Sequence, residues 1–133
     1  MKVNVTSGDI LNGILSDTYC SECFVPFNEA MIVGSCTAPL FSSEFMAERA
    51  DTHGVSLDEY VWKLRGFLDV LDHIEKYDEF ILWFGDEPFC KANIKTVLQA
   101  LKDRSYNGKL ILNIVNEQTA KIVKSEVLQQ ARR

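Results

Sequence analysis

Apolar residues recur along the chain with two alternating periods, and the order of these segments is typical of an α/β protein. Lys2–Thr6 alternates and is rich in β-branched residues, which predicts a strand. After the turn at Ser7-Gly8-Asp9, the apolar spacing in residues 10–15 predicts a short helix. Residues 23–27 predict a short second strand, which Pro26 places at an edge or an end because proline has no amide hydrogen to donate.

Two consecutive helices are expected after an irregular segment. Residues 30–40 contain a glycine, a proline and several small polar residues, which predicts irregular chain. Ser42 can cap a helix that ends at His53-Gly54. Ser56-Leu57-Asp58-Glu59 is a capping-box sequence, and the apolar residues after it recur every three or four positions as far as Ile74. This second helix is the longest that the sequence predicts.

The last third of the chain contains two nearly unbroken apolar runs. Glu79–Phe84 and Lys109–Val115 predict buried strands, and a helix is expected between them from Pro88, whose fixed φ suits a first helical turn. A last helix is expected from Thr119, on the spacing of the apolar residues Ile122, Val123, Val127 and Leu128.

Strands that alternate with helices favour right-handed crossovers and a parallel sheet. We therefore predict one three-layer, Rossmann-like α/β domain across residues 1–133. Its sheet is expected to be mostly parallel, with about four strands and with helices on both faces. The sequence leaves open whether this domain is complete or is the N-terminal part of a longer protein.

Composition and charge limit the classes of partner. The chain is 47% hydrophobic and 25% charged, and no apolar run approaches the roughly 18 residues of a membrane span. The N-terminus lacks the apolar core and the cleavage site of a signal peptide, so we expect a cytoplasmic protein with no membrane partner. A net charge of −5 argues against direct nucleic-acid binding, because phosphate binding needs a clustered basic face.

Acidic residues follow every predicted strand of the parallel sheet. The most informative segment is residues 79–90, where an apolar run stops at Gly85-Asp86-Glu87 and a helix follows. Gly8-Asp9, Asn28-Glu29 and Asn116-Glu117 follow the other strands. Carboxyl ends of parallel strands share one edge, where ligands bind in open α/β sheets. Clustered carboxylates need a cation or a donor-rich ligand, although each acid alone can serve as a helix N-terminal residue.

Two arginines are placed where a guanidinium needs a partner. Arg49 and Arg65 each lie within or beside an apolar helical stripe, so each needs a carboxylate or an anionic ligand. A structural ion pair is the favoured interpretation, and anion binding is the alternative. Gly8 by itself is not a phosphate loop, because neither the G-x-G-x-x-G nor the G-K-[ST] pattern accompanies it.

The cysteines and tryptophans give weaker signals. Cys20 and Cys23 have a spacing that suits zinc or a redox couple, but no second such pair exists, so free thiols are expected and no metal site is assigned. Cys90 has the helix-start position of a nucleophile, yet no histidine lies near it in sequence, which favours a buried, inert thiol. Trp62 and Trp83 are expected in the core.

Three segments together resemble a known family. They are Asn28-Glu29-Ala30-Met31 with Gly34, Phe41-Ser42-Ser43-Glu44-Phe45 with Arg49-Ala50, and Ile81-Leu82-Trp83-Phe84-Gly85-Asp86 with Phe89-Cys90 and Asn93. With Gly8-Asp9 they resemble a bacterial family catalogued as domain of unknown function 1835, and the match spans most of the chain, from Val3 to about Leu101. Ser35-Cys36-Thr37 stands where that family's pattern has a Gly-Pro pair, which implies a different loop shape.

The resemblance implies a shared fold and no established catalytic activity. Members look like standalone proteins or N-terminal domains, some of them associated with transcription. The resemblance also implies a shared pocket, at Asp9, Asn28, Glu29, Arg49, Asp86 and Asn93.

Three functional hypotheses follow. The leading one is a module that binds a small polar ligand, a nucleotide or metabolite, at the carboxyl edge of the sheet, through Asp9, Asn28, Glu29, Arg49, Asp86, Glu87 and Asn93. The second is a magnesium-dependent hydrolase or transferase of phosphate esters, with Asp9, Glu29 and Asp86 as ligands. The third is a homodimeric interaction domain linked to transcription, with Phe41, Phe45 and Met46 as an exposed patch. The sequence identifies no cofactor.

Overall fold

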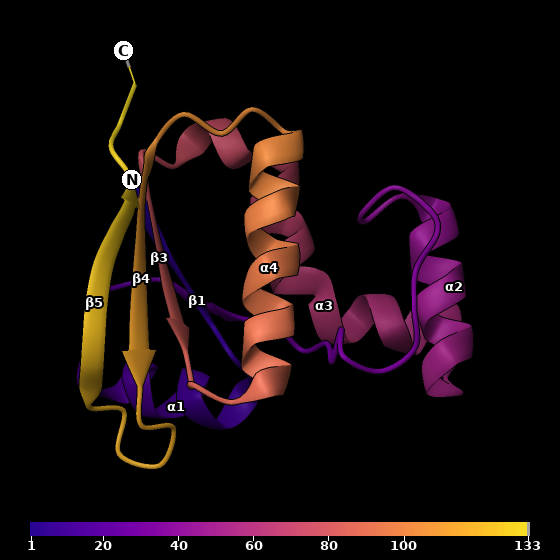
Figure 1. The fold of residues 1–133 in the computed structure, drawn as a ribbon, viewed down its shortest axis with the longest axis horizontal. Helices are drawn as coiled ribbons and strands as arrows, with labels where there is room; N and C mark the ends of the chain where they lie inside the picture. The colour runs from indigo at the N-terminus through magenta and orange to yellow at the C-terminus, as the bar shows by residue number, and fades with distance from the viewer. Residues whose placement is uncertain (133) are drawn as a thin grey trace.

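The computed structural model describes residues 1–132, and within that range five strands form one sheet in the order β2-β1-β3-β4-β5 (Figure 1). The first four are mutually parallel, and β5 runs antiparallel to β4. The α/β class and the mostly parallel sheet are therefore confirmed, with one more strand than expected. The strands are β1 (Lys2–Thr6), β2 (Phe24–Pro26), β3 (Glu79–Phe84), β4 (Lys109–Val115) and β5 (Ile122–Gln129).

The predicted last helix was wrong, because residues 122–129 form strand β5. The chain turns back directly after β4: Asn116 Oδ1 accepts hydrogen bonds from the amides of Gln118 and Thr119, at 2.9 and 3.2 Å. The Ala120 amide closes the turn on the Asn116 carbonyl at 2.7 Å. This reversal brings Ile122 and its neighbours alongside the open edge of β4, where they pair with it. Pairing with an adjacent strand therefore outweighs a helical spacing that is only local.

The helices begin where their capping residues predict. Ser42 Oγ accepts a hydrogen bond from the Phe45 amide at 3.2 Å, and Ser56 Oγ accepts one from Glu59 at 3.1 Å. Gly54 ends the first of these helices with φ of 67°. The helices are α1 (Asp9–Thr18), α2 (Ser43–His53), α3 (Leu57–Asp72) and α4 (Pro88–Asp103), with a 3-10 turn, η1, at Ile74–Lys76.

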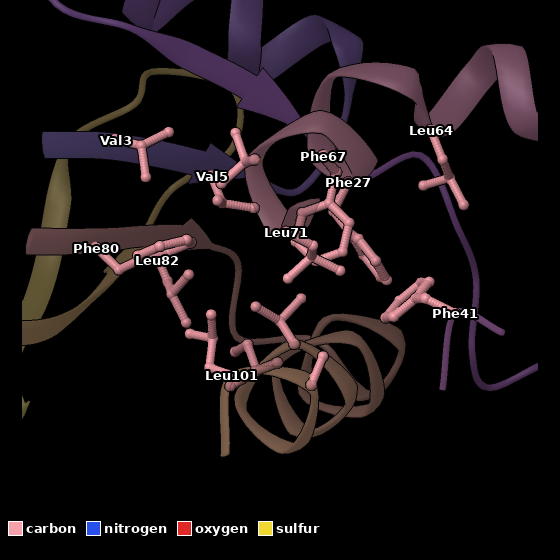
Figure 2. Packing of buried hydrophobic residues seen from close by; sticks show 14 of the residues in the cluster. Val3, Val5, Phe27, Phe41, Leu64, Phe67, Leu71, Phe80, Leu82 and Leu101 are labelled. Atoms are coloured by element: carbon pink, nitrogen blue, oxygen red, sulfur yellow. The ribbon is translucent and has the colours of Figure 1, made fainter. Parts of the chain in front are cut away.

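Helices cover both faces of the sheet, as expected. On one face, α3 and α4 enclose the main core, in which Val5, Leu82 and Phe67 lie close together (Figure 2). On the other face, α1 packs Leu11 and Leu15 against the smaller cluster that includes Trp83. Helix α2 packs against α3, on the side away from the sheet (Figure 1).

Two expectations about exposed and buried aromatic residues were wrong. Phe41 and Phe45 are 8% and 0% exposed, and Phe41 packs against Phe67 with ring centres 5.3 Å apart, so they form no partner patch. Trp62 is 63% exposed, because it lies outside the buried stripe of α3. Trp83 is buried, as expected.

No helix among residues 1–132 is both long and apolar enough to span a membrane.

Candidate ligand site at the carboxyl edge of the sheet

The segments that follow the four parallel strands lie at one edge of the sheet, as the sequence predicts. Their acidic side chains nevertheless do not converge on one point. Among residues 1–132, no three His, Cys, Asp or Glu side chains come together in the way that metal ligands do. The edge is therefore divided into separate polar environments.

A pocket of ≈ 580 Å³ opens beside the ends of β1 and β2. Two of the expected residues meet there, because Asn28 Nδ2 donates hydrogen bonds to Asp9 Oδ1 at 3.0 Å and to the Lys63 carbonyl at 3.2 Å. These contacts join the start of α1, the end of β2 and the middle of α3. The lining residues that can ionise or form hydrogen bonds are Ser7, Asp9, Asn28, Glu29, His53, Tyr60 and Lys63.

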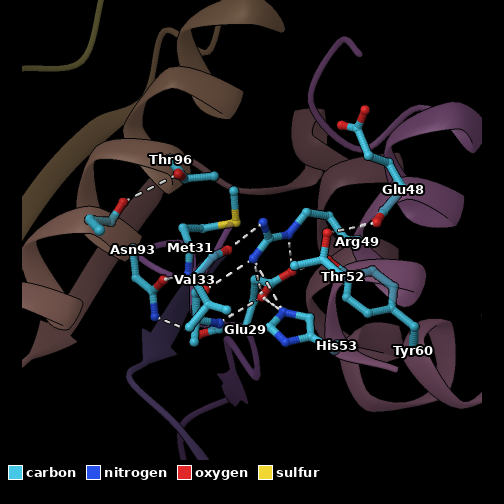
Figure 3. A network of polar contacts seen from close by, with 12 residues as sticks. Glu29, Met31, Val33, Glu48, Arg49, Thr52, His53, Tyr60, Asn93 and Thr96 are labelled. Carbon is cyan, nitrogen blue, oxygen red and sulfur yellow. Dashed lines mark hydrogen bonds and ion pairs between the residues drawn. The ribbon is translucent and has the colours of Figure 1, made fainter. Parts of the chain in front are cut away.

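The Glu29 carboxylate lies behind this pocket in a buried ion pair (Figure 3). Arg49 donates from Nε to Oε2 and from Nη2 to Oε1, both at 3.0 Å. Both side chains are completely buried. A paired fork of this kind is the strong, directional form of the arginine–carboxylate interaction. The favoured interpretation of Arg49, a structural ion pair, is confirmed.

Further donors complete the shell of the Glu29 carboxylate. Oε1 accepts from the Ala30 amide at 2.7 Å and contacts His53 Nε2 at 2.5 Å, while Oε2 accepts from the Tyr60 hydroxyl. Burial alone would raise the pKa of Glu29, but hydrogen bonds from Arg49, Tyr60, Ala30 and His53 outweigh it and lower the pKa to about 2. Burial and the bond to Glu29 raise the pKa of Tyr60. Glu29 is therefore an ionised, saturated acceptor at neutral pH.

Arg49 and Asn93 hold the chain segment that follows Glu29. Arg49 also donates to the carbonyls of Val33 at 2.7 Å and of Ala30 at 3.0 Å. Asn93, on α4, donates to the Glu29 carbonyl at 2.7 Å and accepts from the Met31 amide at 2.9 Å. Three elements distant in sequence are thereby tied together. Arg49 and Asn93 shape the wall of the site and do not line the pocket.

The close approach of this segment to α2 requires a glycine. Gly34 has φ of +69°, a conformation that side chains disfavour, and a Cβ there would lie 2.6 Å from Thr52 Cγ2.

Asp86 and Glu87 lie away from the pocket. Asp86 is exposed, contacts Lys91 at 3.7 Å, and borders a separate groove between α4 and β5. Glu87 is exposed and stands at the N-cap position of α4, with no hydrogen bond from its side chain to the helix. Glu87 therefore has the helix N-terminal position of the alternative interpretation, but no amide of α4 donates to its carboxylate, and Asp86 pairs with Lys91 instead.

Sequence analysis did not identify His53, Tyr60, Lys63 and Ser7 as residues of the site. One signal was available, because Arg49 and His53 are four residues apart on α2 and therefore lie on the same side of that helix. Nothing in the sequence around Lys63 or Ser7 distinguishes these residues from ordinary surface positions.

Glu117 occupies the crevice between the ends of β1 and β3. The strand order changes direction at β1 and β3, which is where ligands bind in sheets of this type. Ser7 Oγ donates to Glu117 Oε2 at 2.5 Å, and Cys90 Sγ lies 3.6 Å from Oε1. A Cβ at Gly85 would collide with the Glu117 side chain. Glu117 therefore fills this crevice, and the open space near it is the neighbouring pocket beside β1 and β2.

Four residues that the sequence singled out, Cys90, Cys20, Cys23 and Arg65, lie outside the pocket. Cys90 is completely buried, and burial together with the nearby Glu117 carboxylate raises its pKa to about 11, so the expectation of a buried thiol is confirmed. Cys20 and Cys23 are exposed free thiols. The expected ion pair of Arg65 was wrong: within residues 1–132 Arg65 has no carboxylate partner, donates to the Trp62 carbonyl at 2.7 Å and stacks on the exposed Trp62 ring, 3.7 Å from its centre.

Comparisons of the chain with protein-family models, with curated proteins and with solved structures found no match.

Proposed function

We propose that this protein binds a small polar ligand, a nucleotide or a metabolite with an anionic group, in the pocket beside β1 and β2. One observation carries the proposal. His53 and Tyr60 line the pocket, and contacts with the buried Glu29 carboxylate fix both side chains. Side chains held in one geometry lose little freedom when they bind, which favours affinity and specificity.

The chemistry of the walls supports a ligand with both donor and acceptor groups. Within residues 1–132, no carboxylate lies within ion-pair distance of Lys63, so its ammonium group is available to an anion. Asp9 presents a carboxylate that can accept hydrogen bonds from hydroxyl or amino groups. Val55, which is half-buried, adds apolar surface beside these polar groups. A phosphorylated sugar or nucleoside combines the complementary features.

A thermal-shift screen against nucleotides, phosphorylated metabolites and divalent ions tests the proposal. A ligand at 100 times its Kd stabilises the folded state by about 2.7 kcal/mol, so a true ligand raises Tm measurably. We expect that stabilisation to be lost in Asp9→Asn and in Lys63→Met, because each variant removes one charged group from the pocket.

Asp86→Asn is the matched control, since it removes one exposed carboxylate at the same edge of the sheet but outside the pocket. It should respond to the ligand as the unaltered protein does. A ligand that stabilises all four proteins equally, or a panel without any stabilising compound, would contradict the proposal.

The magnesium-dependent hydrolase or transferase gains no support from this geometry. Glu29 already accepts hydrogen bonds from Arg49 and Tyr60, so its oxygens are not available as metal ligands. Asp86 borders a different groove from Asp9. Divalent ions are retained in the panel as the direct test of that hypothesis.

Membership of the domain of unknown function 1835 family stays a proposal, together with a cytoplasmic location. The proposed family membership is supported by one buried network, in which Glu29, Arg49 and Asn93 meet; all three come from the segments that resemble the family. We expect relatives that share these three residues to share this pocket wall.

A further inference from the structure

Strand β5 is an edge strand with no partner on its outer side among residues 1–132. Its inner side pairs with β4 along Ile122–Gln129, and it forms the margin of the sheet beside β4 (Figure 1), at the opposite end of the strand order from β2. Its side chains from 122 to 128 are exposed. Unpaired amides and carbonyls along an edge of this length are a template for pairing with another strand.

The exposed side chains of β5 are unusually apolar for such an edge. Val123 is 73% exposed, Ile122 is 49%, Val127 is 47% and Leu128 is 36%. Proteins ordinarily protect long edges with proline or with an uncompensated charge, and β5 contains no proline. Its only charged residues, Lys124 and Glu126, contact each other at 3.7 Å. The two register shifts of β5 lie toward its ends, so residues 124–127 between them form a regular stretch of edge whose charges compensate each other.

The surface beside this edge combines apolar residues with charged ones, among them Lys95 and the Lys124 and Glu126 of β5 itself. A groove of ≈ 560 Å³ lies between α4 and β5, with Leu112, Ile114 and Val123 among its lining residues. This is a second sign that the β5 end of the sheet is covered less well than its centre.

The order of residues in β5 matches its own antiparallel copy. If a two-fold axis passes at Ser125, Lys124 of each copy stands opposite Glu126 of the other. The same axis brings the apolar residues at the two ends of the strand together, Ile122 and Val123 of one copy near Val127 and Leu128 of the other. Moving the axis to residue 124 or 126 sets like charges opposite each other, which is unfavourable. Residues 124–127 lie between the two register shifts of β5, so the charged pairs fall in its regular part.

We propose that two copies of this chain associate through β5, antiparallel and in the register centred on Ser125, to form one continuous sheet. A two-fold interface of this kind uses the same surface on both copies, and each Lys124–Glu126 pair occurs twice. The proposed ligand pocket lies beside β1 and β2, toward the opposite margin of the sheet, so the two proposals fail or succeed independently.

Sedimentation of the full chain, from about 1 to about 500 µM, measures the association directly. We expect a particle of twice the 15.1 kDa chain mass at the upper concentrations. Lys124→Glu and Glu126→Lys should each raise the dissociation constant by about tenfold or more, because each replaces two attractive cross-strand pairs with two repulsive ones.

Mixing the two variants gives the decisive result. In a heterodimer of Lys124→Glu with Glu126→Lys, every cross-strand pair again joins opposite charges, so dimers should return when the two are combined. The double exchange Lys124→Glu with Glu126→Lys should likewise dimerise alone. Lys76→Glu, an equal charge change at an exposed residue outside β5, is the control and should leave association unchanged.

Two outcomes would overturn the proposal. A monomer at every concentration would show that β5 does not recruit a second copy, and any partner would then be a different chain. A dimer that resists both single exchanges, or that the mixture fails to restore, would place the interface elsewhere.

Discussion

At the scale of single residues, the contacts of Glu29 are structural, and Glu29 is distinct from the exposed residues that we propose to bind a ligand. A buried ion pair costs desolvation, and its attraction offsets that cost only where the geometry is good and the remaining lone pairs are satisfied. Arg49, Tyr60, His53 and the Ala30 amide meet that condition. The network therefore stabilises the pocket wall, whereas Asp9 and Lys63 are exposed and are the residues that we propose for ligand binding.

The lowered pKa of Glu29 makes stability depend on pH in a defined direction. Its folded pKa of about 2 lies below the ordinary 4.5, so the folded state favours the charged form. This contribution, about 3 kcal/mol, is fully present above pH 4.5 and is lost as the pH falls toward 2. Urea unfolding followed across this range should show that loss.

Glu29→Gln tests the assignment. It leaves Arg49 buried without a counter-charge, so we expect the free energy of unfolding at pH 7 to fall by about 3–5 kcal/mol. The variant should also lose the decline below pH 4.5 that Glu29 causes. Glu44→Gln, at an exposed position on the same helix as Arg49, is the control and should retain this decline. An unchanged acid dependence in Glu29→Gln would contradict the role of this carboxylate.

At the scale of elements, the helix starts are determined by residues close in sequence, whereas the last strand is determined by residues outside it. The caps at Ser42 and Ser56 act within one turn of chain, so the sequence is sufficient to place them. Strand β5 depends on β4 and on the turn at Asn116, which lie outside its own sequence.

Ser56→Ala tests the local contribution. Removing the hydroxyl that accepts the Glu59 amide should lower the free energy of unfolding by about 1 kcal/mol, measured by urea unfolding. Ser43 is the exposed first residue of α2, and its hydroxyl caps nothing. Ser43→Ala should therefore change the free energy of unfolding by close to zero. Equal effects of the two substitutions would mean that the cap contributes no stability.

At the scale of the whole molecule, the protection of backbone amides from hydrogen exchange is expected to decrease from the centre of the sheet to the β5 edge. Strand β3 lies between β1 and β4 and is buried along Phe80–Phe84, whereas β5 has one neighbour and exposed side chains. Local opening therefore requires less free energy in β5 than in β3.

Amide hydrogen exchange measures this gradient. In Glu126→Lys, which we expect to be monomeric, the β5 amides should exchange faster than those of β3 by orders of magnitude. In the unaltered protein at high concentration, outward-facing β5 amides should slow, while β3 amides should change little. Equal exchange rates in β3 and β5 of the monomer would contradict the gradient.

The sequence by itself determined most elements and the edge at which their polar ends gather. Apolar periodicity and capping residues act over a few positions, and the parallel order of β1 to β4 then places Asp9, Asn28, Asp86 and Glu117 at one edge. Contacts between distant segments select the acid that turns inward to Arg49, leave other acids exposed, and make residues 122–129 a strand. These outcomes depend on partners distant in sequence, such as Tyr60 for Glu29 and β4 for β5, and local patterns contain no information about them.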